Sequence, residues 1–158
     1  MNAQERLGFK PEELAKIHDG LNDLLSNMQV FYMNVRGLHW NIKGSAFFEL
    51  HEKFELIYDE LALNIDAVAE RILTLGATPL HSFTAYLERA EIPEAKHISD
   101  GVEAVHTLLD GFQVLLLKER AILNLADAAG DEGTVELMSG YIKQQEKHIW
   151  MYAAYLAN

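Results

Sequence analysis

The feature that most constrains the fold is a stripe of apolar residues whose spacings alternate between four and three from Ile17 to Leu38. This spacing places the apolar side chains on one face of an α-helix, and that face must be buried against other elements. The stripe consists of Ile17, Leu21, Leu24, Met28, Phe31, Val35 and Leu38. It predicts a helix from about Pro11 to Trp40, ended by the stretch Asn41 to Ser45.

Helical periodicity continues through the rest of the chain. We expect a second long helix from about Ala46 to Leu75, stopped by Gly76, and a short helix over Ser82 to Arg89. A third long helix begins near Ser99, and the last follows Gly130 to Gly133. The expected inward-facing residues are Phe54, Tyr58, Leu61, Ile65, Val68 and Ile72 in the second long helix, Val102, Val105, Leu109, Phe112, Leu116 and Leu123 in the third, and Met138, Ile142, Ile149, Tyr152 and Leu156 in the last. The chain is predicted to be all-α: a ferritin-like four-helix bundle with a short extra helix in the crossover between helices two and three.

Length and composition narrow the class of protein. A chain of 158 residues fits one domain, which we expect to span residues 1–158 with residues 1–10 as a short N-terminal tail. The formal net charge is −11, which disfavours nucleic-acid binding because duplex affinity depends on phosphate neutralisation by Lys and Arg. The chain has no cysteine, so metal ligands must be oxygen or nitrogen. With no apolar run that resembles a signal peptide or a membrane span, we expect a soluble cytoplasmic protein without a membrane partner.

An acidic stripe on the second long helix is the main functional feature. Its carboxylates fall within roughly a 60° arc of one helix face. His51 lies beside this stripe, and His39 lies twelve residues upstream. Such carboxylates repel one another unless water, cations or a metal compensate, and histidine nitrogens favour a transition metal over calcium. A solvated helix face is the alternative for the stripe alone. The stripe consists of Glu52, Glu55, Asp59, Asp66 and Glu70.

The spacing within the stripe limits where a metal can bind. His51 and Asp66 are fifteen residues apart, or roughly 22 Å along a helix axis, too far to share one ion within one chain. The sequence predicts either no shared site or a site at a dimer interface. In the second case, His39 and His51 of one subunit face Asp66 and Glu70 of the other, and two-fold symmetry creates two equivalent sites.

A di-iron site inside a single bundle is not expected. Such a site needs a Glu-x-x-His motif on each of two helices. Glu94 and His97 form one such motif in an expected loop, and Glu103 and His106 form one on a helix without a second well-placed copy. We interpret Glu103 and His106 as surface or packing residues.

At these residues the chain closely resembles the Dps family, the DNA-binding proteins from starved cells, also called mini-ferritins. The resemblance covers nearly the whole chain in colinear order. The matching segments are Gly37–Asn41, Phe48–Phe54, Tyr58–Glu60, Asp66–Arg71, Leu75–Pro79, Gly130–Asp131 and Glu146–Met151. The resemblance implies a hollow dodecamer that oxidises Fe(II), preferably with hydrogen peroxide, and stores ferric mineral. It also implies ferroxidase sites across the two-fold interface, each taking two iron ions, with zinc or manganese as substitutes.

The resemblance assigns roles residue by residue. His39, His51, Asp66 and Glu70 match the family's ligand positions, and Glu55 matches a position usually held by Asp or Glu. Trp40 adjoins a ligand and is either an electron donor or an interface aromatic that buries the site. The cavity-wall candidates, where ferric ions would nucleate, are Glu52, Glu55 and Asp59, with a solvated face as an equal alternative for Asp59. The candidates for a pore that admits Fe(II), or alternatively for an ordinary helix-capping loop, are Asp127, Asp131, Glu132 and Glu136.

DNA binding is expected to be weak or absent. The family often binds DNA through a Lys-rich terminal tail, whereas residues 1–13 contain only Arg6 and Lys10 as bases. The main alternative function is a chromosome-compacting Dps protein whose main role is DNA protection. Two others are a metal-independent dodecamer and a manganese catalase, since the ligand types do not exclude manganese.

Overall fold

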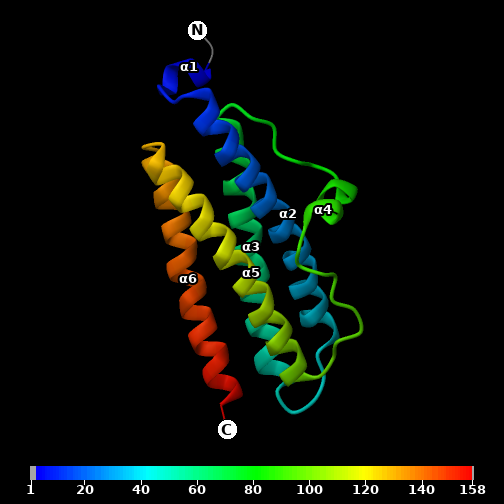
Figure 1. The fold of residues 1–158 in the computed structure, drawn as a ribbon. Coiled ribbons are helices and arrows are strands. Elements are labelled where there is room, and N and C mark those ends of the chain that lie inside the picture. The colour runs from blue at the N-terminus through cyan, green and yellow to red at the C-terminus, as the bar shows by residue number, and fades with distance from the viewer. Residues whose placement is uncertain (1–2, 158) are drawn as a thin grey trace.

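The structure is a computed structural model and describes residues 3–157, over which six helices and no strand occur. The helices are α1 (Ala3–Leu7), α2 (Pro11–Asn41), α3 (Phe47–Thr74), α4 (Phe83–Arg89), α5 (Gly101–Ala128) and α6 (Glu132–Leu156). The four long helices α2, α3, α5 and α6 lie side by side, and α4 lies on the outer side of α2 (Figure 1). Helices α3 and α5 run in the same direction because the connection that contains α4 returns along the bundle (Figure 1). The predicted all-α bundle with a short helix in the crossover is confirmed.

The chain before α2 has some regular structure of its own. It contains the short helix α1, and Gly8 then adopts a positive φ of 80° before Pro11 opens α2. Met1 and Asn2 lie outside the described residues. No helix of the described chain combines the length and apolar character that a bilayer span requires.

The core forms where the periodicity predicts it. Every residue of the stripe from Ile17 to Leu38 is buried, with at most 2% of its surface exposed. The expected inner face of α3 is also buried, apart from Ile65, which is half-buried. The prediction was wrong for Val102, which is 53% exposed. Its neighbour Gly101 faces the bundle instead, close to Leu50 of α3, so Val102 is rotated away by one helical step.

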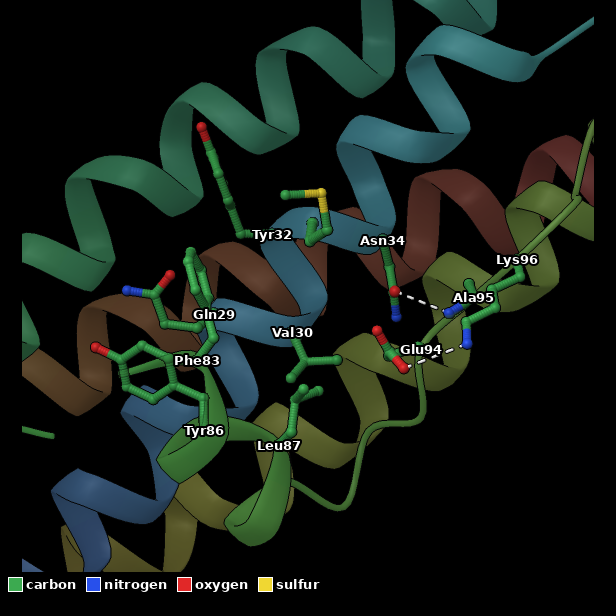
Figure 2. A pocket seen from close by; sticks show the side chains of 11 residues that line it. Gln29, Val30, Tyr32, Asn34, Phe83, Tyr86, Leu87, Glu94, Ala95 and Lys96 are labelled. Carbon is green, nitrogen blue, oxygen red and sulfur yellow. Dashed lines mark hydrogen bonds and ion pairs between the residues drawn. The ribbon is translucent and has the colours of Figure 1, made fainter. Parts of the chain in front are cut away.

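Asparagines on α2 hold the crossover in place. Asn27 accepts the backbone N–H groups of Glu91 and Ile92 at 2.9 and 3.0 Å. Asn34 accepts the N–H of Ala95 at 2.9 Å, beside a pocket of about 280 Å³ between α2 and α4 (Figure 2). These bonds pair backbone groups that would otherwise be left without partners in a connection that packs on a helix. They fix a segment whose sequence has little helical or strand character.

A polar pair interrupts the apolar core between α5 and α6. Glu119 and Gln145 are 0% and 2% exposed, and Gln145 Nε2 donates to Glu119 Oε1 at 2.6 Å. Within the described structure, Glu119 Oε2 and Gln145 Oε1 have no hydrogen-bond partner. Burial raises the pKa of Glu119 to about 8 and outweighs the opposing effects of Gln145 and Arg120. Glu119 is therefore a carboxyl group that stays protonated near neutral pH.

Candidate metal centre

Two histidine rings are locked together where α2 ends and α3 begins. His39 Nδ1 donates to the backbone carbonyl of His51 at 2.7 Å, and His51 Nδ1 donates to the carbonyl of His39 at 2.8 Å. A carbonyl oxygen can only accept, so each Nδ1 carries the hydrogen and each neutral ring keeps its Nε2 lone pair free. The carbonyl of His39 belongs to the last turn of α2, where helix carbonyls lack intrahelical partners. The bond from His51 therefore satisfies a helix end and orients a potential metal ligand at once.

Aromatic packing restrains both rings further. The two imidazoles stack with their centroids 3.8 Å apart and their planes 16° apart. Phe47 stacks on His51 at 5.0 Å, and Tyr58 places its ring nearly perpendicular to that of His39 at 5.2 Å. His39 is 7% exposed and His51 is half-buried. The pair is thus held rigidly in one orientation, as a binding site for a metal ion requires.

The acidic half of the expected ligand set lies elsewhere on the subunit. Asp66 and Glu70 are exposed on α3, fifteen and nineteen residues beyond His51. Among the described residues, no three His, Asp or Glu side chains lie close enough together to hold one ion. The histidine pair and the acidic pair therefore do not meet within one subunit, in line with the spacing argument. A shared ion requires a second copy of the chain.

The other candidates on α2 and α3 are mostly exposed. Glu52, Glu55 and Asp59 are exposed on α3. Burial, together with the charge of Glu55, raises the pKa of Tyr58. Trp40 is 57% exposed, and the guanidinium of Arg36 lies 5.0 Å from the centre of its ring.

The acidic cluster at the α5–α6 corner divides into two groups. Asp127, Glu132 and Glu136 are exposed. Asp131 is 1% exposed, forms an ion pair with Arg71, and accepts the N–H of Thr134 at 3.1 Å as the N-cap of α6. Its carboxylate is therefore committed to capping α6 and to the ion pair with Arg71, as in the helix-capping alternative.

The Glu-x-x-His motifs do not build a site inside the bundle. Glu94 and His97 lie in the connection before α5, and Glu103 and His106 are exposed near the start of α5.

The buried polar pair between α5 and α6, Glu119 and Gln145, was missed at the sequence level. A signal existed for Glu119, because it occupies the position between Leu116 and Leu123 in the α5 stripe, at the same spacings of three and four. Gln145 follows Met138 and Tyr141 on α6 in the same way.

Comparison with known proteins identifies the class. A family model described as a ferritin-like domain matches residues 18–158. A crystal structure described as the Dps protein from Vibrio cholerae O1, "a member of a broad superfamily of ferritin-like diiron-carboxylate proteins", superposes with a TM-score of 0.93 at 54% identity, covering 94% of each chain. The fold and the match together define a ferritin-like protein.

The more specific family follows from the named relatives. The "DNA protection during starvation protein" of Porphyromonas gingivalis is 46% identical over 151 residues, which cover 96% of this chain and 95% of the relative. The Dps of Listeria innocua, solved after soaking with zinc, is 31% identical with a TM-score of 0.86, covering 89% of this chain and 95% of that one. The chain belongs to the Dps family.

Proposed function

We propose that the protein oxidises Fe(II), preferably with hydrogen peroxide, and stores the ferric product as mineral inside a dodecameric cage in the cytoplasm. The observation that carries the proposal is the reciprocal bonding of His39 and His51, which occupies both Nδ1 atoms and leaves each Nε2 as the ligand nitrogen. Nδ1 donation to a carbonyl is the usual way in which a metal-binding histidine is oriented. The description of the Vibrio cholerae relative as a diiron-carboxylate protein supports the same chemistry.

Each site is proposed to lie between two copies of the chain. His39 and His51 come from one copy, and Asp66 and Glu70 come from the other, on an α3 helix that runs antiparallel to the first. Glu55 lies one turn after His51 on the same helix and is the further ligand. Imidazole nitrogens suit Fe(II), and carboxylates favour the ferric product, so this mixed set binds the substrate and drives its oxidation. Zinc and manganese accept the same ligand types.

Two iron ions at one site explain why peroxide is a safe oxidant. Each Fe(II) gives one electron, the O–O bond breaks, and the two oxygens leave as water after taking up two protons. No hydroxyl radical is released because both electrons arrive together. Trp40 then either covers the site in the assembly or gives an electron when the site is over-oxidised.

Exposed acids are proposed to guide iron to and from the sites. Glu52, Glu55 and Asp59 line the cavity wall and collect ferric ions. Near the α5–α6 corner, Asp127, Glu132 and Glu136 line a pore whose negative potential attracts Fe(II). The net charge of −11 on each chain strengthens this attraction.

The test is replacement of the acidic pair by its amides, Asp66→Asn with Glu70→Gln. The amides keep the size and the hydrogen-bonding capacity of the side chains but remove their charge, so Fe(II) oxidation by peroxide should slow severely. The matched control is Glu103→Gln with His106→Ala, which alters an exposed acid and histidine of α5. Ferric absorbance in a stopped-flow instrument measures both. A wild-type rate in the amide variant would show that the site has been assigned to the wrong residues.

DNA protection as the main role is the second candidate, favoured by the name of the Porphyromonas gingivalis relative. The charge of the chain argues against it, because several bases are paired with acids, including Arg71 with Asp131 and Arg120 with Glu146. A gel-shift titration against plasmid at low salt distinguishes the two. We expect no shift, and tight cooperative condensation would favour the DNA-binding role.

A further inference from the structure

A cluster of aromatic side chains surrounds Arg36, one turn before His39 on α2. The guanidinium carbon of Arg36 lies 4.6 Å from the ring centre of Tyr58, 5.0 Å from that of Trp40 and 5.6 Å from that of Tyr32. Arg36 Nη1 also donates to the Tyr32 hydroxyl at 2.8 Å. A cation held over three rings is a stabilising arrangement, and it fixes the position of each ring. We call Tyr32, Arg36, Trp40 and Tyr58 the Arg36 cluster.

The tyrosines of this cluster form a continuous path from the candidate metal centre. Tyr58 meets the ring of His39 edge-on at 5.2 Å, and Tyr32 meets Tyr58 edge-on at 6.2 Å with the planes 88° apart. Trp40 differs from Tyr58 in that its described ring contact is with Arg36 and not with His39. The tyrosine route away from His39 therefore starts at Tyr58 and does not include the neighbouring tryptophan.

We propose that Tyr58 and Tyr32 form a one-electron relay that protects the protein when a site holds a single Fe(II) ion. This inference rests on the proposed ferroxidase function. One Fe(II) supplies only one of the two electrons that peroxide needs, so the remaining oxidising equivalent would leave as a hydroxyl radical. The relay supplies the second electron from a tyrosine. Tyr58 passes the electron to the site, and Tyr32 then reduces Tyr58.

The atoms, electrons and charge of this step balance with Fe(II), hydrogen peroxide and Tyr32 alone. The O–O bond of hydrogen peroxide breaks, Fe(II) gives one electron, and the Tyr32 phenol gives one electron and its proton. One peroxide oxygen leaves as hydroxide, and the other takes up a proton and leaves as water. The products are Fe(III), hydroxide, water and a neutral phenoxyl radical on Tyr32, and the total charge is unchanged.

Arg36 makes Tyr32 the end of the relay. Its positive charge, hydrogen-bonded to the phenol, disfavours a radical that keeps its proton, so electron and proton leave together. The same N–H then remains bonded to the phenoxyl oxygen. Tyr32 is half-buried, which gives its proton a way to water, whereas Tyr58 is 9% exposed. Figure 2 shows the Tyr32 side chain extending from α2 with its hydroxyl turned away from Phe83 and Tyr86.

The experiment loads the assembled protein with one Fe(II) per site, adds excess hydrogen peroxide and freezes the sample for electron paramagnetic resonance. Ring-deuterated tyrosine identifies a tyrosyl radical by the narrowing of its signal, and a spin trap reports hydroxyl radical. We expect a tyrosyl signal in the wild type, its loss from the double variant Y32F/Y58F, and more trapped hydroxyl radical in that variant. Phenylalanine keeps the ring contacts, so the fold should not change. The control Tyr155→Phe, at an exposed position near the end of α6, should keep the signal.

Three results would overturn the relay while leaving the proposed function in place. The first is a tyrosyl signal that persists in Y32F/Y58F. The second is a signal unaffected by deuterated tyrosine and lost in Trp40→Phe, which would assign the electron to the tryptophan. The third is the absence of any protein radical while two Fe(II) per site are oxidised at the normal rate, which rejects the relay alone. If the wild type fails to oxidise iron at all, the proposed function is wrong and the relay fails with it.

Discussion

The buried carboxyl of Glu119 gives the sharpest stability prediction. Its pKa is raised by burial from 4.5 to about 8, so at pH 7 the folded protein keeps a proton that the unfolded chain has lost. Each unit between the pH and the unfolded pKa of 4.5 corresponds to about 1.4 kcal/mol while the folded carboxyl stays protonated. Keeping the proton in the folded state at pH 7 therefore costs about 3 kcal/mol, from 7 − 4.5 units. Glu119→Gln removes this cost and lets the new amide pair with Gln145 in both directions. We expect the variant to be more stable than the wild type by up to about 3 kcal/mol at pH 7.

The sign of the pH dependence follows from the direction of the shift. Below the pKa of the unfolded chain, Glu119 is protonated in both the folded and the unfolded state. The wild type and Glu119→Gln should then differ little in their free energy of unfolding. Between pH 4.5 and about 8 the unfolded chain ionises while the folded chain does not, so the wild type loses stability relative to the variant. Above that range the difference levels off.

Urea unfolding followed by circular dichroism, at matched protein concentration and at several pH values, measures this difference. Glu103→Gln, the same change at an exposed site of α5, is the control and should stay within about 0.5 kcal/mol of the wild type. A Glu119→Gln variant that is less stable than the wild type at pH 8, or a difference that does not change with pH, would refute the reasoning.

Two further substitutions test the packing of the bundle core and the capping of α6. Gly111→Ala should destabilise by about 1–3 kcal/mol, because a Cβ at this position would lie 2.2 Å from Cε2 of Phe31; a neutral effect in thermal denaturation would mean that Phe31 moves freely. Asp131→Ala should cost about 3 kcal/mol, because it removes the cap of α6 and leaves Arg71 without its partner. Asp131→Asn should recover part of that loss in the same assay, and equal losses for both variants would contradict the capping role.

The fold could be predicted from the sequence because its signals are local. The stripe from Ile17 to Leu38 depends only on the period of the helix, and the structure buries all of it. Gly76 was predicted as a helix stop, and it adopts a φ of 87° while donating its N–H to the carbonyl of Leu73. Ala77 donates to the carbonyl of Ile72 and completes the motif that ends α3.

Apart from Glu119 and Gln145, the features that sequence reasoning missed depend on contacts between distant segments. Asn27 and Asn34 look like ordinary polar residues of a helix, but they bind backbone groups about sixty residues later in the chain. Asp131 was grouped with exposed acids because its partner, Arg71, lies on another helix. Periodicity indicates which face of a helix is buried, but not which polar side chain it meets there.

Only part of the candidate site could be predicted from the sequence. Residue types and spacing indicated His39 and His51, but their mutual hydrogen bonds depend on how the loop between α2 and α3 closes. Their separation from Asp66 and Glu70 could be inferred from helix geometry alone. The relay from His39 to Tyr32 could not, because it needs the orientation of three rings.

The most direct test of a shared site is complementation between two inactive variants produced in the same cells. One carries His39→Ala with His51→Ala, and the other carries Asp66→Asn with Glu70→Gln. In a mixed dimer, one of the two sites combines the intact histidines of one chain with the intact acids of the other. With equal amounts and random pairing, about a quarter of all sites should be restored. We predict that mixed cages regain ferroxidase activity near that fraction of the wild-type rate, whereas mixed cages as inactive as either parent would contradict a site shared between two chains.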